Sequence, residues 1–134
     1  MATSLRKRSH GFTLIELMIV ISIILILVAV AVPNYRASIV HARESVLRQN
    51  LFTLRSVISQ YTLDKEKAPQ SLDDLVQAGY MKELPNDPIT NKPDWTVEQE
   101  DSTIMSVDQE DSGIDDVHSS SEAISSDGTA YNTW

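Results

Sequence analysis

The hydrophobic and polar positions of this chain fall into two patterns that meet near Pro33. From Phe12 to Val32 the residues are almost all apolar, and fifteen of them are Leu, Ile, Val or Phe. A run of this length can cross the apolar core of a bilayer, which needs about 20 residues. Between positions 34 and 64 there is no Gly or Pro, and apolar side chains return every three or four residues, which predicts an amphipathic helix. Its apolar stripe is expected to be Val40, Leu47, Leu51, Leu54, Ile58 and Tyr61.

Together these patterns predict one long helix from Phe12 to about Lys65, kinked at Pro33. Pro69 disfavours helix in the residue before it, so the long helix ends there. Ser71 is a suitable N-cap for a short helix over 72–78, and Gly79 closes it. Two short strands are expected farther on, at 95–97 and 103–107. The fold class is therefore α+β: a long N-terminal helix packed on a small head with a short antiparallel sheet.

The composition of the chain excludes some classes of chemistry and of partner. The 134 residues include no cysteine, so disulfides and thiol chemistry are excluded. The formal net charge is −8, and residues 93–134 hold eleven acids with no Lys or Arg. An acidic segment of this kind repels phosphate backbones, which argues against nucleic acid as a partner.

One carboxylate, Glu16, lies inside the apolar run, and a charge inside a membrane-length segment is usually functional. The apolar side chains contribute roughly −5 to −9 kcal/mol to insertion, against about +3 for one charge near mid-helix. The segment therefore inserts despite Glu16. Arg6, Lys7 and Arg8 keep the N-terminus in the cytoplasm, which places everything after Pro33 on the far side.

Two simpler interpretations compete. An ordinary secretory signal peptide would have the same basic start and apolar core, with cleavage after Ala31 in the triplet Ala29-Val30-Ala31. A one-pass membrane anchor is the other. Both leave Glu16 without a role.

The residues Gly11-Phe12-Thr13-Leu14-Ile15-Glu16 resemble the processing site of the type IV pilin-like family, which includes the type II secretion pseudopilins. The resemblance implies that a prepilin peptidase cuts between Gly11 and Phe12 and then N-methylates Phe12. It implies that Glu16 pairs with a neighbouring subunit's terminal amine during assembly, and Pro33 falls where the family has a helix-kinking proline. The implied organisation is a leader peptide at 1–11, a transmembrane and filament-core helix at 12–33, and a periplasmic head at 34–134.

The resemblance extends to Leu84-Pro85 and Asp87-Pro88, which are similar to the layout of the major pseudopilins. Major type IV pilins typically end in a disulfide-bounded loop, which a chain without cysteine cannot form. The implied function is a structural subunit of a type II secretion pseudopilus, a homopolymer that drives protein export across the outer membrane. The subunit would cross the inner membrane once, with its head in the periplasm. Implied partners are the lipid bilayer before assembly, the prepilin peptidase, an inner-membrane assembly platform and ATPase, and minor pseudopilins. A type IV pilus subunit forming surface filaments, or a periplasmic calcium-binding domain released by signal peptidase, stays open as an alternative.

Major pseudopilins commonly hold a calcium ion in the C-terminal loop, so the resemblance implies a Ca²⁺ site here. Calcium takes six to eight oxygen ligands, and acidic and hydroxyl side chains near a Gly turn are suitable. The candidate ligands, in order of preference, begin with Asp127 and Asp116 and continue with Ser119, Ser121 and Glu122. A solvated acidic loop without an ion is the alternative interpretation.

Catalysis is not indicated. The three histidines are scattered, and neither a nucleophile elbow nor a phosphate-binding Gly-rich loop is present in the sequence. His118 stands beside Ser119, but adjacent loop residues seldom reach the geometry of a nucleophile and its base. We therefore predict that the protein is not an enzyme.

Overall fold

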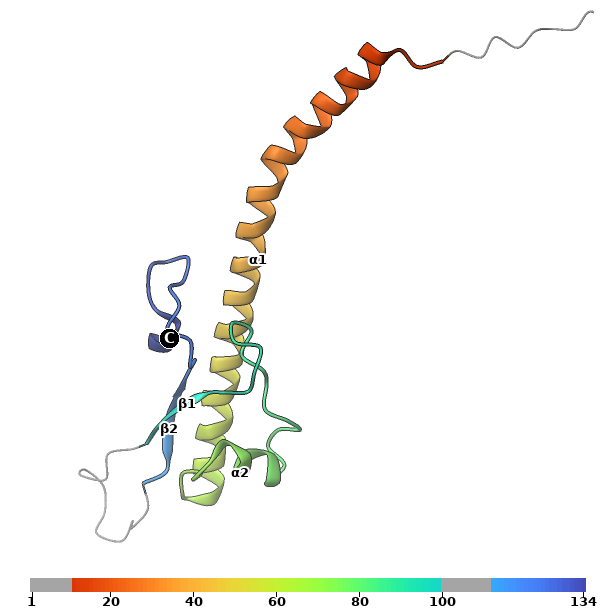
Figure 1. Ribbon diagram of the computed structural model, residues 1–134. Helices are drawn as coiled ribbons and strands as arrows, with labels where there is room; N and C mark the ends of the chain where they lie inside the picture. The colour runs from red at the N-terminus through yellow and green to blue at the C-terminus, as the bar shows by residue number, and fades with distance from the viewer. Residues whose placement is uncertain (1–10, 100–111) are drawn as a thin grey trace, which may run out of the picture. The chain divides into compact units, whose positions relative to one another are not determined.

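The computed structural model describes residues 11–99 and 112–134, and the predicted strand at 103–107 lies outside them. Figure 1 shows the elements in chain order. They are α1 (Leu14–Lys65), α2 (Leu72–Gln77), β1 (Thr96–Gln99), β2 (Ile114–His118) and a short 3₁₀ helix, η1 (Tyr131–Thr133). The predicted α+β class, one long N-terminal helix with a small antiparallel sheet, is confirmed. The chain divides into two compact units, Met1–Ser38 and Ile39–Trp134, which are described separately.

In the first unit, α1 begins with a capped turn. The Oγ1 atom of Thr13 accepts a hydrogen bond from the main-chain N–H of Glu16 at 3.3 Å, as an N-cap residue does. Every described residue of this unit is exposed. The apolar window of α1 is long enough and apolar enough to cross a membrane, and none of it is buried.

The second unit is the head, and its core lies on one stripe of α1. Leu47, Leu51, Leu54 and Ile58 are buried as predicted, against Leu72, Leu75, Trp95, Ile114, Val117 and Tyr131. Of the other two predicted stripe residues, Tyr61 packs against this core and Val40 is 41% exposed. The buried face of α1 begins at Glu44, one turn later than the apolar pattern indicated.

The helix ends follow the sequence. α1 ends at Lys65, and Glu66 turns the chain with a φ of 55°. The Asp74 carboxylate accepts a hydrogen bond from the main-chain N–H of Ser71 at 2.9 Å, which caps α2. Gly79 leaves α2 with a φ of 81°, a left-handed conformation that glycine adopts without strain. The second helix and its caps were therefore predicted correctly, within one residue at its end.

The sheet has two antiparallel strands, and Figure 1 shows them beside the head part of α1. β1 overlaps the predicted strand at 95–97, and Val97 pairs with Val117 of β2. β2 was not predicted, because its sequence contains two consecutive aspartates. Its Ile114 and Val117 are nevertheless buried in the core.

β2 is fixed to the loop that follows α1. The main-chain N–H of Ile114 donates to the carbonyl oxygen of Pro69 at 2.8 Å. Directly before it, Gly113 lies against Ala68, and a Cβ atom on Gly113 would stand only 2.8 Å from the Ala68 carbonyl carbon. This close approach of two backbones requires glycine at position 113.

Candidate functional site

The residues of the predicted processing site lie at the exposed start of α1. Gly11, Phe12 and Thr13 precede the helix, and the side chain of Phe12 is 81% exposed. Among the described residues, nothing lies within 4 Å of where a Cβ on Gly11 would be. Gly11 and Phe12 are thus both exposed, in the short segment that precedes the helix.

Glu16 occupies the first turn of α1 and is exposed. The N-terminus of a helix carries a partial positive charge, which favours a carboxylate in the first turn. The side chains around it are apolar and uncovered: Leu14, Ile15 and Leu17 are 79%, 64% and 52% exposed. Glu16 is therefore a single acid on an exposed apolar surface. Contact with lipid or with other protein would remove this surface from water.

Pro33, the third predicted assembly residue, lies inside α1, which continues on both sides of it. Proline has no main-chain N–H, so the i→i−4 hydrogen bond to the carbonyl of Ala29 cannot form. The expected kink at this position stays a prediction.

The two preferred calcium ligands form ion pairs with two different arginines of α1. Asp127 accepts from Nη2 of Arg48 at 2.7 Å, and both side chains are 60% exposed. Asp116 accepts from Nε of Arg55 at 2.5 Å. Each carboxylate is thus neutralised by a cation of the protein.

The other three predicted calcium ligands are separate from this pair: in the part of the chain that the structure describes, no hydrogen bond joins them to Asp127 or Asp116. The hydroxyl of Ser119 is buried and donates to the buried carboxylate of Asp87. The Oγ of Ser121 accepts from the main-chain N–H of Ala123 at 3.3 Å, and Glu122 is exposed. Among residues 11–99 and 112–134, no group of three or more His, Asp or Glu side chains is arranged to hold a metal ion. As they stand, the five residues do not fit one calcium ion, and the Ca²⁺ site stays a prediction.

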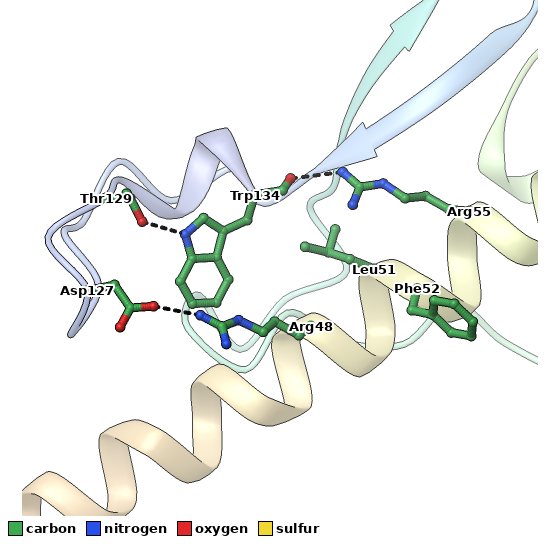
Figure 2. Close-up of a pocket in the computed structure, with 7 residues that line it drawn as sticks. All are labelled: Arg48, Leu51, Phe52, Arg55, Asp127, Thr129 and Trp134. Carbon is green, nitrogen blue, oxygen red and sulfur yellow. Dashed lines mark hydrogen bonds and ion pairs between the residues drawn. The ribbon is translucent and has the colours of Figure 1, made fainter.

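A groove of about 410 Å³ opens between α1 and the C-terminal loop, as Figure 2 shows. The Arg48 guanidinium lies 4.3 Å from the centre of the Trp134 ring, in a cation–π contact, while it pairs with Asp127. The indole Nε1 of Trp134 donates to the Thr129 hydroxyl at 2.8 Å. Leu51, Phe52 and Arg55 complete the lining. These contacts fix the end of the described chain to α1.

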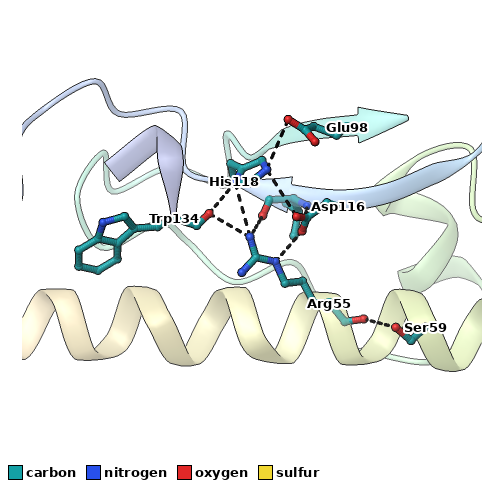
Figure 3. Close-up of polar contacts among 7 residues, drawn as sticks. Arg55, Ser59, Glu98, Asp116, His118 and Trp134 are labelled. Atoms are coloured by element: carbon teal, nitrogen blue, oxygen red, sulfur yellow. Dashed lines mark hydrogen bonds and ion pairs between the residues drawn. The ribbon is translucent and has the colours of Figure 1, made fainter. Parts of the chain in front are cut away.

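Arg55 gathers the second set of polar contacts, which Figure 3 shows. Its Nη2 donates to the main-chain oxygens of Val117 at 3.0 Å and of Trp134 at 2.9 Å. Burial acts to raise the pKa of Asp116, but the hydrogen bonds from Arg55 and from the main-chain N–H of Val117, with the nearby positive charge, outweigh it and the pKa is lowered. His118 places its Nδ1 2.5 Å from the same Trp134 oxygen. These groups, His118 among them, hold β2 and the end of the C-terminal loop on α1.

Sequence reasoning missed a buried charged residue of the head, Glu44. Its carboxylate accepts hydrogen bonds from the main-chain N–H of Ser126 at 2.7 Å, from the Ser126 hydroxyl at 2.5 Å and from the Tyr131 hydroxyl at 3.0 Å. The two hydrogen bonds from Ser126 lower the pKa of Glu44, although burial acts against them. A signal was present, because Glu44 stands four residues after Val40 and three before Leu47, on the apolar stripe.

Comparison with known proteins adds to this geometry. The family described as "Prokaryotic N-terminal methylation motif" matches residues 6–32. The chain is 33% identical over 102 residues to type II secretion system core protein G of Aeromonas hydrophila, covering 64% of this chain and 71% of that protein. It is 36% identical over 78 residues to competence protein ComGC of Halalkalibacterium halodurans, covering 57% and 76%.

A third relative is the type IV major fimbrial protein FimA of Dichelobacter nodosus, 39% identical over 66 residues. That alignment covers 49% of this chain and 41% of FimA. No solved structure matches the chain significantly.

Proposed function

The chain belongs to the type IV pilin-like family, in which type II secretion core protein G is one of its relatives, and from this premise we propose that it is a structural subunit of a type II secretion pseudopilus. The family consists of membrane-anchored filament subunits, so the protein is a structural component and not an enzyme. The finer assignment, to a pseudopilus that exports proteins, is the proposal.

The observation that carries it is the apolar start of α1, in which no residue is buried and one acid lies in the first turn. Exposed apolar surface of this extent is unfavourable in water and has to be covered. A bilayer covers it before assembly. The same surfaces of other copies cover it afterwards, so one helix can serve first as an anchor and then as a filament core.

Processing would prepare that change. A prepilin peptidase would cut between Gly11 and Phe12 and methylate the new amine of Phe12. Because both residues precede the helix and are exposed, the cleavage site does not require α1 to unwind. The reaction would remove the basic leader and leave one positive charge close to the start of the apolar segment.

Glu16 would then select the position of the next subunit. A carboxylate in an apolar filament core is costly alone and becomes tolerable beside a protonated amine, whereas removal of either partner leaves an uncompensated charge. The pair of Glu16 with a neighbour's Phe12 amine would thus favour one stagger between subunits over all others. Pro33 would let the apolar half of α1 bend relative to the helix that follows.

In this account the subunit crosses the inner membrane once and holds its head in the periplasm. An assembly platform and its ATPase would extract it, minor pseudopilins would join the same filament, and growth of the filament would move proteins through the outer membrane. The protein itself would do no chemistry.

A type IV pilus subunit is the second candidate, favoured by the similarity to FimA. It is less well supported, because the FimA alignment covers less than half of that protein, whereas the protein G alignment covers 71% of its partner. The chain also has no cysteine with which to close a pilin-type disulfide loop.

Deletion of the gene in its own host separates the two. For a pseudopilus subunit, we expect folded exoproteins to accumulate in the periplasm while surface filaments and twitching motility are unchanged. Plasmid-borne wild-type protein should restore export. Normal export together with loss of surface filaments would reject the pseudopilus and favour the pilus.

A further inference from the structure

We propose that the C-terminal loop of the head is closed onto α1 by a clasp made of protein groups alone, and that the head therefore folds without calcium. The clasp consists of Glu44 on α1 with Ser126 and Tyr131 from the loop and η1. This proposal concerns how the head is held together, and it stands whether the filament is a pseudopilus or a pilus.

The first support is the satisfaction of a buried charge. Glu44 is only 4% exposed, and an unpaired carboxylate at that depth would be strongly destabilising. Three donors meet it: the N–H and hydroxyl of Ser126 and the hydroxyl of Tyr131. The Nδ1 atom of the exposed His41 lies 3.6 Å from Oε2 of Glu44. Hydrogen bonds to an ionised acceptor are about twice as strong as neutral ones, so the loop is held firmly at this point.

The second support is that the C-terminal loop directs hydrogen-bond donors toward the Glu44 carboxylate. A calcium loop directs oxygen atoms toward a common centre. Here the turn closed by the Ser125 N–H donating to the Thr129 carbonyl directs the N–H and O–H of Ser126 toward an anion. The left-handed Gly128, with a φ of 84°, makes this turn possible. The turn that the sequence suggested for a cation thus binds a carboxylate of the protein.

The third support is the position of the predicted ligands. Asp127 and Asp116 pair with Arg48 and Arg55, and a guanidinium beside each carboxylate would repel a divalent cation. The Ser119 hydroxyl points its proton at Asp87. The arginines and Glu44 together occupy the role that an ion would otherwise have in closing this loop.

Thermal unfolding of the full-length protein in detergent tests the proposal, with Trp95 and Trp134 as fluorescent reporters of the head. In wild type we expect the same Tm with millimolar calcium chloride and with EGTA. Glu44→Gln replaces an acceptor of three bonds by an amide whose NH₂ faces donors, so its Tm should fall by about 5 °C or more in both buffers. The matched control is Glu83→Gln, the same substitution at an exposed acid of the head outside the candidate calcium ligands, with an unchanged Tm expected in both.

A rise of several degrees in wild-type Tm on adding calcium, or an equal fall in EGTA, would overturn the proposal. A Glu44→Gln protein that melts like wild type would overturn it as well. If that variant does not fold, Tyr131→Phe decides, because it removes one donor and keeps the ring. Its Tm should be lower than that of wild type and should not recover with calcium, and recovery would contradict a metal-free clasp.

Discussion

The carboxylate of Glu44 accepts a hydrogen bond from the main-chain N–H of Ser126 at 2.7 Å, although the two residues are 82 positions apart in the chain. The acceptor lies where the buried face of α1 begins, and the donor lies in the last turn before η1. The contact therefore joins the first and last parts of the head. It also makes the stability of the head depend on one ionised side chain.

That dependence predicts acid sensitivity. The folded head lowers the pKa of Glu44 and of Asp116, so the unfolded chain binds more protons than the folded one as the pH falls. The stabilisation is complete above the ordinary carboxyl pKa values of about 4, and it is lost as the pH falls through the lowered folded values. Urea midpoints measured at about pH 7, 5 and 3 should be similar at the first two and clearly lower at the third.

The variant Glu44→Gln provides the control, since the glutamine amide does not take up a proton in this pH range. Its midpoint should start lower at neutral pH and change less on acidification than that of wild type. An equal loss in both proteins would assign the acid sensitivity to other carboxylates.

The contact between Gly113 and Ala68 predicts a steric effect. Gly113→Ala would place a Cβ against Ala68 and force two backbones apart, at a cost of about 1–3 kcal/mol in the free energy of unfolding. Chemical denaturation measures this directly. The double variant with Ala68→Gly should recover part of the loss, because it removes the Ala68 Cβ, the nearest atom that the new Cβ meets, while the Ala68 carbonyl group remains. No recovery would mean that the Ala68 side chain contributes little to the clash.

The contacts of Arg55 predict that lysine cannot replace arginine at this position without a loss of stability. Its guanidinium bonds Asp116 and the main-chain oxygens of Val117 and Trp134 at the same time, a pattern that the single ammonium of lysine cannot reproduce. Arg55→Lys should lower the free energy of unfolding by about 1–2 kcal/mol. The same change at the exposed Arg43 should have an effect within about 0.5 kcal/mol. Equal effects at the two positions would show that the fork of hydrogen bonds at Arg55 contributes little.

Much of the fold could be predicted because its signals are local. Pro69 after Lys65 ended α1, while Ser71 and Gly79 bounded α2, and each acts through its own backbone. The stripe from Leu47 to Ile58 was also predictable, since helical spacing alone identifies a buried face.

The rest depends on partners far away in the chain. β2 contains Asp115 and Asp116 and was interpreted as an acidic loop, because nothing near it in sequence shows that Arg55 neutralises one of these acids. Glu44 was passed over for the same reason, since its donors are 82 and 87 residues away. Asp127 was predicted to be a calcium ligand, and in the structure it forms an ion pair with the guanidinium of Arg48, 79 positions earlier in the chain.

The assembly account predicts the behaviour of Glu16 variants. Glu16→Ala should still insert and be processed, because removing a charge only improves insertion into the bilayer. Filament yield should fall strongly, since the amine of Phe12 would lack its partner in the apolar core. Sheared filaments quantified by immunoblot, against total cell protein, measure the yield. The control is Glu122→Gln, which removes an exposed acid of the head and should assemble normally. Wild-type yield from Glu16→Ala would remove the pairing from the account.

The mass and sequence of the mature N-terminus test the central claim most directly, namely that this chain is processed as a pilin-like filament subunit. Protein purified from membranes of the native host should lack residues 1–11 and begin with N-methylated Phe12. A mature chain that begins at Val32 would instead show ordinary signal-peptide cleavage after Ala31. That result would leave no anchor, no filament helix and no role for Glu16, and it would contradict the account.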